Sequence, residues 1–120
     1  MLPLKPKRVE KEWGHEIWLV NNDKENYCGK ILFIRRGKST SMHYHVDKHE
    51  TMYVLKGTLM IDGLSDNRTK KHTYSVAVKE GESIEIERDR AHKLIAHGED
   101  VTIIETSTLH RDEDSHRLWR

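Results

Sequence analysis

The sequence predicts an all-β fold, a small antiparallel barrel of the jelly-roll type built from short strands. Three observations indicate it. From Glu16 onward the apolar residues come in short groups at strand-like spacing, polar or glycine-bearing turns separate the groups, and no stretch holds a helical period. A sheet that curls into a barrel removes most of its open edges, and a small barrel can enclose one ligand or one metal ion.

The expected strands are short and regularly spaced. They run over residues 16–20, 27–35, 41–45, 51–56, 58–62, 72–78, 83–87, 92–96 and 101–106. Turn-forming residues separate several of them, as in Asn21-Asn22-Asp23, Arg36-Gly37 and Glu80-Gly81. This pattern is typical of an antiparallel sheet.

The size and composition of the chain fit one folded domain. It has 120 residues, of which 35% are hydrophobic and 34% are charged, and the net charge is only +1. Two domains of half this length would each bury too little apolar surface. We therefore expect a single domain over residues 1–120, with charged arms at about 1–11 and 108–120.

Composition also bears on location and partners. No apolar run approaches the roughly 18 residues that span a bilayer, and residues 1–10 lack the apolar segment of a secretory signal. Balanced charge gives no general reason to bind nucleic acid or a membrane, and a lone cysteine, Cys28, fits a reducing compartment. We expect a soluble, cytoplasmic protein.

Two histidines and a glutamate form the most informative pattern. Because side chains alternate along a strand, His43 and His45 point to one face and lie about 6.6 Å apart. Glu50 follows a short polar turn, so a hairpin folds its carboxylate back beside the two imidazoles. The spacing predicts three metal ligands from one short segment.

A third histidine, His92, is a candidate fourth ligand. It begins an expected strand on which Leu94 and Ala96 share its face. Three imidazoles and one carboxylate suit Mn, Fe, Co, Ni, Cu or Zn rather than Ca or Mg. Four protein ligands leave an open position on a five- or six-coordinate ion, as a catalytic metal requires.

These residues resemble the two motifs of the cupins. The first, G(X)5HXH(X)3-4E(X)6G, is matched by Gly37, His43, His45, Glu50 and Gly57. The second, G(X)5PXG(X)2H(X)3N, is matched at Gly81 and His92, whereas Glu87, Asp89 and Ala96 replace its proline, glycine and asparagine. The resemblance implies a β-barrel that holds one divalent transition metal (Mn, Fe, Zn, Ni or Co), and it implies that the chain forms a homodimer, as many cupins do.

The flanks are similar to the cupin domain of type II mannose-6-phosphate isomerases. The similarity rests on the segment Glu12-Trp13-Gly14-His15-Glu16, on Ile103-Ile104-Glu105 and on the acidic residues Asp112-Glu113-Asp114. It implies an aldose–ketose isomerase of a sugar or sugar phosphate such as mannose 6-phosphate, in which the metal acts as a Lewis acid. A non-haem iron dioxygenase and a non-catalytic cupin that binds a saccharide or small molecule are the alternatives.

Other residues complete the expected site. Glu105 and Lys30 are the candidate catalytic groups for proton transfer, because both sit on strands that could face the cavity. Arginines at the mouth of the barrel would bind a substrate phosphate, and the candidates are Arg35, Arg36, Arg88, Arg90 and Arg117. His49 precedes Glu50 and points to the opposite face of a regular strand, and His110 lacks a partner pattern, so both are expected at the surface.

Overall fold

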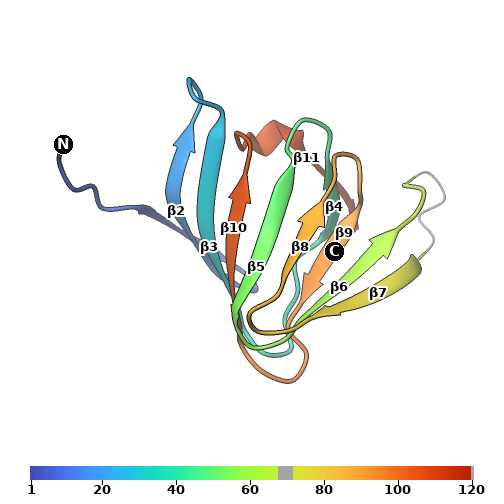
Figure 1. Ribbon diagram of the computed structural model, residues 1–120. Helices are drawn as coiled ribbons and strands as arrows, with labels where there is room; N and C mark the ends of the chain where they lie inside the picture. The colour runs from blue at the N-terminus through green and yellow to red at the C-terminus, as the bar shows by residue number, and fades with distance from the viewer. Residues whose placement is uncertain (68–71, 120) are drawn as a thin grey trace.

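The chain folds into two antiparallel sheets that face each other, as Figure 1 shows for the computed structural model. The structure describes residues 1–67 and 72–119. One sheet has the strand order β1-β2-β3-β10-β5-β8 and the other has the order β11-β4-β9-β6-β7. The elements are β1 (Lys7–Lys11), β2 (Gly14–Asn22), β3 (Tyr27–Ile34), β4 (Met42–His45), β5 (Glu50–Lys56), β6 (Leu59–Leu64), β7 (His72–Val78), β8 (Ser83–Ile86), β9 (His92–Ile95), β10 (Val101–Ser107), the 3₁₀ helix η1 (Asp112–Asp114) and β11 (Ser115–Trp119).

This architecture confirms the expected all-β jelly-roll fold. Every expected strand has a counterpart, with bounds that differ by a few residues. Within the described ranges, no helix is long and apolar enough to cross a bilayer.

The two outermost strands in sequence, β1 and β11, were not among the expected ones. β1 pairs with β2 at one edge of the larger sheet, and β11 pairs with β4 at one edge of the smaller sheet. Their sequences, KRVEK and SHRLW, carry little apolar alternation. An edge strand covers less of the core, so its side chains need not follow the alternation that predicts an interior strand.

The apolar core fills one end of the space between the sheets. Alternate residues of β3 point inward, and at this end of the strand the inward-facing residues are Leu32 and Ile34, which are both buried. The cluster contains Leu32, Ile34, Met52, Val54, Leu59, Ile61, Val78, Ile86, Leu94, Ala96, Val101 and Ile103. It fixes the two sheets against each other.

The same inner faces become charged toward the other end. Lys30 lies two residues before Leu32 on β3, Glu105 lies two residues after Ile103 on β10, and both are buried. The register pairs Glu105 with Lys30 across the two strands. Since alternation keeps such residues on one face, the strands that build the core also carry polar groups into the interior.

The turn before β9 contains the substituted motif position, Asp89. Its backbone is left-handed, with φ of 64°, and its N–H donates a hydrogen bond of 2.7 Å to the carbonyl of His45. Aspartate is one of the few non-glycine residues that adopt this conformation. The turn that the motif builds with glycine is therefore formed here with aspartate.

Gly57, the last residue of the first motif, is under a steric constraint. Its φ is +89°, and a Cβ there would lie 2.5 Å from the carbonyl oxygen of Asp100. Gly57→Ala is expected to lower the free energy of unfolding by at least about 2 kcal/mol. Urea denaturation checks this, with Gly98→Ala as the control because a Cβ at Gly98 meets open space. Equal stability of the two variants would contradict the constraint.

Candidate metal centre

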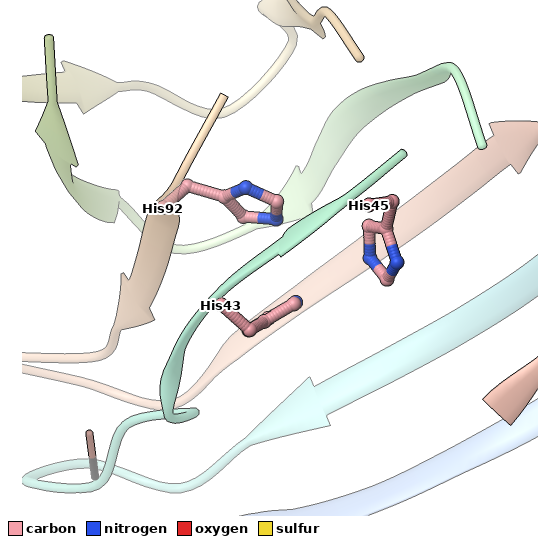
Figure 2. Close-up of side chains that lie close together, drawn as sticks. All are labelled: His43, His45 and His92. Atoms are coloured by element: carbon pink, nitrogen blue, oxygen red, sulfur yellow. The ribbon is translucent and has the colours of Figure 1, made fainter. Parts of the chain in front are cut away.

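Three imidazoles converge between the sheets. His43 and His45 come from β4, and His92 comes from the neighbouring strand β9, where the register pairs it with His43. Figure 2 shows the three rings gathered from these two strands. One ring nitrogen of each lies within 4.8 Å of the others. The structure thus positions three histidines to hold one metal ion.

Backbone carbonyls set the orientation of all three rings. The Nδ1 atom of His43 lies 2.9 Å from the carbonyl of Ser41, that of His45 lies 3.2 Å from the carbonyl of Asp114, and that of His92 lies 2.8 Å from the carbonyl of Arg90. A carbonyl oxygen only accepts, so each Nδ1 carries the hydrogen and each Nε2 keeps its lone pair. Metal-binding histidines are held by partners of this kind.

The carboxylate of Glu50 adjoins the imidazoles. Its Oε2 atom lies 3.5 Å from Nε2 of His45 and 3.6 Å from Nε2 of His92, and the Glu50 side chain is 2% exposed. Two ligands each about 2.1 Å from one ion lie roughly 3.0–3.4 Å apart, which is close to these separations. Glu50 Oε2 and His92 Nε2 are buried and have no hydrogen-bond partner among the described residues. Orphaned acceptors that face each other fit a shared cation.

Burial keeps the three imidazoles neutral. It lowers the pKa of His43 and His45 to about 3 and that of His92 to about 4. Neutral imidazole is the form that ligates a metal. The pKa values therefore match the proposed role of the cluster.

A buried ion pair stands beside Glu50. The Nζ atom of Lys48 lies 2.7 Å from Oε2 of Glu105 and 3.9 Å from Oε1 of Glu50. Burial alone would lower the pKa of Lys48, but the two carboxylates outweigh it and raise the pKa. Burial alone would likewise raise the pKa of Glu105, but Lys48 and Lys30 outweigh it and lower the pKa. Both groups are charged at neutral pH.

The balance of charge around the centre depends on whether Glu50 is ionised. Three carboxylates, those of Glu16, Glu50 and Glu105, meet two ammonium groups, those of Lys30 and Lys48. Burial first, and the charge of Glu105 second, raise the pKa of Glu50. With Glu50 ionised, the carboxylates would outnumber the ammonium groups by one, and a divalent cation at the three histidines would offset that excess negative charge and favour ionised Glu50. The residues present therefore fit a metal of the expected class.

A cavity of about 860 Å³ opens onto this centre. Its walls include His43, His45, Lys48 and both candidate catalytic residues, Glu105 and Lys30. Glu50 and His92 are buried and do not belong to these walls. The cavity gives a small polar substrate access to the centre.

The structure separates the candidate arginines. Arg117, on β11, lines the cavity, whereas Arg35, Arg36, Arg88 and Arg90 do not belong to its walls. Arg88 instead donates a hydrogen bond to the carbonyl of Asp47.

The candidate catalytic residue Lys30 has two partners. Its Nζ atom lies 3.6 Å from Oε1 of Glu16 and 4.2 Å from the centre of the Trp18 ring, an arrangement that suits an ammonium group.

Sequence reasoning missed three residues near the centre: Lys48, His110 and Asp114. The expectation that His110 lies at the surface was wrong. Its side chain is 9% exposed, lines the cavity and places Nδ1 3.2 Å from Nζ of Lys48. His49 does lie at the surface, where it pairs with Glu85. The only signal for Lys48 was its place between His45 and Glu50, and a turn residue has no alternation that would orient it.

The neutral histidines make a testable pH dependence. In the metal-free protein, His43, His45 and His92 each have a pKa below the value of 6.5 of an ordinary histidine. The unfolded chain therefore binds protons first as the pH falls below 6.5, and stability is lost by up to about 1.4 kcal/mol per pH unit for each histidine. The pKa of Glu50, which burial and the charge of Glu105 raise to about 8, acts in the opposite direction and offsets about two of the three histidines between pH 7.5 and 5.5, so that net stability falls mainly below pH 6.5.

Urea unfolding with a chelator at pH 7.5, 6.5 and 5.5 measures this effect. His43→Gln should lose less stability over the range than the unmodified protein, because one proton uptake is removed. His97→Gln, at an exposed position, should lose as much as the unmodified protein. Parallel curves for all three proteins would show that His43 is not held neutral by burial.

Solved structures share this fold at low sequence identity. CapF, the capsular polysaccharide assembling protein from Staphylococcus aureus, aligns with a TM-score of 0.77 and 15% identity over 96% of this chain and 34% of its own. A variant of Bacillus subtilis oxalate decarboxylase aligns with a TM-score of 0.79 and 14% identity over 94% of this chain and 30% of its own. The chain thus spans about a third of the length of these two proteins.

A protein of similar size also matches. KdgF from Halomonas sp. aligns with a TM-score of 0.71 and 15% identity, and the alignment covers 89% of each chain. No curated protein matches the sequence. The family model described as "Cupin domain" matches residues 31–107, a range that holds both histidine motifs and more than half of the chain. The chain belongs to the cupin family.

Proposed function

We propose that the protein is a metal-dependent aldose–ketose isomerase that acts on a sugar or sugar phosphate. The observation that carries the proposal is the ion pair of Glu105 and Lys48, which lines the same cavity as His43 and His45 and lies beside Glu50. A ligand set alone would serve many reactions. A carboxylate and an ammonium group beside it supply what a proton transfer between neighbouring carbons requires.

Isomerisation moves two hydrogens and needs no oxidant. In this proposal the Glu105 carboxylate takes the proton from the hydroxyl-bearing carbon next to the carbonyl and returns it to the former carbonyl carbon. The hydroxyl proton passes to the former carbonyl oxygen, so the atoms balance through an enediol. Lys48 and Lys30 lower the pKa of Glu105, so this carboxylate is ionised at neutral pH, which is the form that a general base requires.

The proposed metal ligands are His43, His45, Glu50 and His92. When bound, a divalent ion supplies Lewis-acid polarisation of the substrate carbonyl and its neighbouring hydroxyl. Lys48 and Lys30 are fixed cations that face the same space. With the ion present, the buried charges sum to a positive value, which favours the negative oxygen that develops as the carbon loses its proton.

The walls of the cavity offer groups that suit a phosphorylated substrate. Arg117 and Lys38 belong to its walls, together with the hydroxyl-bearing residues Ser39 and Ser41. Arginine binds phosphate through two parallel hydrogen bonds, and serine hydroxyls complete such a shell. Mannose 6-phosphate is the substrate that the resemblance of the flanking segments favours.

The first test concerns metal content. Protein purified without added metal is expected to hold a transition metal at close to one equivalent, as measured by elemental analysis. His45→Ala should lose it, because one of three imidazoles and its link to Glu50 are removed. His97→Ala, an exposed histidine, should retain it. Equal trace metal in all three proteins would contradict the centre.

The second test concerns the base. Glu105→Gln is expected to lower kcat for conversion of mannose 6-phosphate to fructose 6-phosphate by about 10²- to 10⁴-fold, with metal content preserved. Glu99→Gln, at an exposed position, should leave kcat unchanged. Activity should persist without oxygen. A strict need for oxygen would instead support the dioxygenase, and metal-independent binding of a sugar without turnover would support a binding protein.

A further inference from the structure

The loop between two proposed ligands is held by a residue from the far end of the chain. Residues 46–49 connect His45 to Glu50. The carboxylate of Asp114 accepts hydrogen bonds from the backbone N–H groups of Val46, Asp47 and Lys48, at 2.9, 3.0 and 3.0 Å. Asp114 is 6% exposed, so these bonds are shielded from water. Three consecutive amides that donate to one carboxylate restrict the backbone of the loop.

Asp114 also contacts a proposed ligand directly. Its backbone carbonyl lies 3.2 Å from Nδ1 of His45, the contact that leaves Nε2 of that ring free. One residue thus orients the His45 imidazole through its carbonyl and holds the path to Glu50 through its carboxylate. The two contacts converge on the pair His45 and Glu50, whose facing atoms are 3.5 Å apart.

The position of Asp114 is itself fixed by the fold. It ends η1, and β11 begins at the next residue, where the register pairs Ser115 with His45. This segment lies beyond residues 31–107, the range that matches the cupin family model. The contacts therefore come from a part of the chain that the family pattern does not describe.

We propose that Asp114 is a positioning residue for the metal centre, which sets its metal affinity by holding His45 and the 46–49 loop in the binding geometry. The proposal rests on the metal centre of the proposed function. Outer partners of this kind typically change metal affinity by about 10- to 100-fold when they are removed. A purely structural clamp would change the stability of the fold and leave the affinity of the folded protein unaltered.

The test compares Asp114→Ala, Asp114→Asn and the neighbouring control Glu113→Ala. Glu113 lies on the same 3₁₀ helix and is exposed. Affinity for Zn²⁺ is measured by competition with a chromophoric chelator, and thermal unfolding of the metal-free proteins confirms that each is folded at the assay temperature. We expect Asp114→Ala to bind Zn²⁺ about 10- to 100-fold more weakly and Glu113→Ala to bind as the unmodified protein does.

Asp114→Asn provides a second measurement of Zn²⁺ affinity if the alanine variant does not fold. The asparagine oxygen can still accept from Val46 and Asp47, but its amide group would face the N–H of Lys48, so an intermediate loss of affinity is expected. Zn²⁺ affinity within twofold of the unmodified protein in the folded Asp114 variants overturns the proposal while the metal centre stands.

Hydrogen exchange separates this failure from failure of the proposed function. In the metal-free protein the amides of Val46, Asp47 and Lys48 should be protected, and Asp114→Ala should expose them while Glu113→Ala does not. If the unmodified protein binds no Zn²⁺, the proposed function fails and so does the role of Asp114 in affinity, whatever the exchange result. Unchanged protection in Asp114→Ala overturns the hold on the loop by itself.

Discussion

The interior of this barrel must accommodate buried charge. Lys30, Lys48, Glu50 and Glu105 are each at most 3% exposed, and an isolated ion in such a place would cost several kcal/mol. Each of them lies within 4 Å of an opposite charge, and the shortest contact joins Lys48 to Glu105. The arrangement tolerates no single member alone, so the strands that carry these residues must keep their register. The centre and the fold depend on each other through this network.

The strand register brings these buried charged side chains together without further structural elements. β3, β5 and β10 each place apolar side chains inward at one end and charged side chains inward at the other. The apolar end supplies the packing that holds the sheets together, and the charged end is carried along by strand geometry. The same principle brings β4 and β9 together, where one backbone pairing sets His43 opposite His92. A slip by one residue would turn the ligands out of the barrel.

The sequence predicted much of the fold and of the ligand cluster because both rest on local periodicity. The His-X-His spacing fixes a common face, and the alternation of Ile84 and Ile86 locates the strand before the turn to His92. Residues without a period could not be placed. Lys48 lies on a turn, His110 follows the last core strand, and Asp114 acts through contacts 66 to 69 residues away in sequence. Such long-range contacts depend on how the chain ends pack, which no local pattern encodes.

The departure at Asp89 is resolved by backbone geometry. The residue adopts the left-handed conformation that glycine adopts easily, and its N–H bonds the carbonyl of His45. That bond ties the turn before β9 to the end of β4, so the strands that supply the imidazoles are linked beyond their ladder. Whether a turn accepts a substitution thus depends on the φ value it demands rather than on the identity of the motif residue.

Strand β11 has one more consequence. By pairing with β4, it forms hydrogen bonds with the backbone amides and carbonyls at the outer edge of the strand that carries His43 and His45. If the chain were cut after Ser107, this edge of β4 would be exposed, and its unpaired backbone groups could pair with a strand from another molecule. β11 therefore covers an edge of the strand that carries two of the imidazoles, and that edge would otherwise be open to pairing with another molecule.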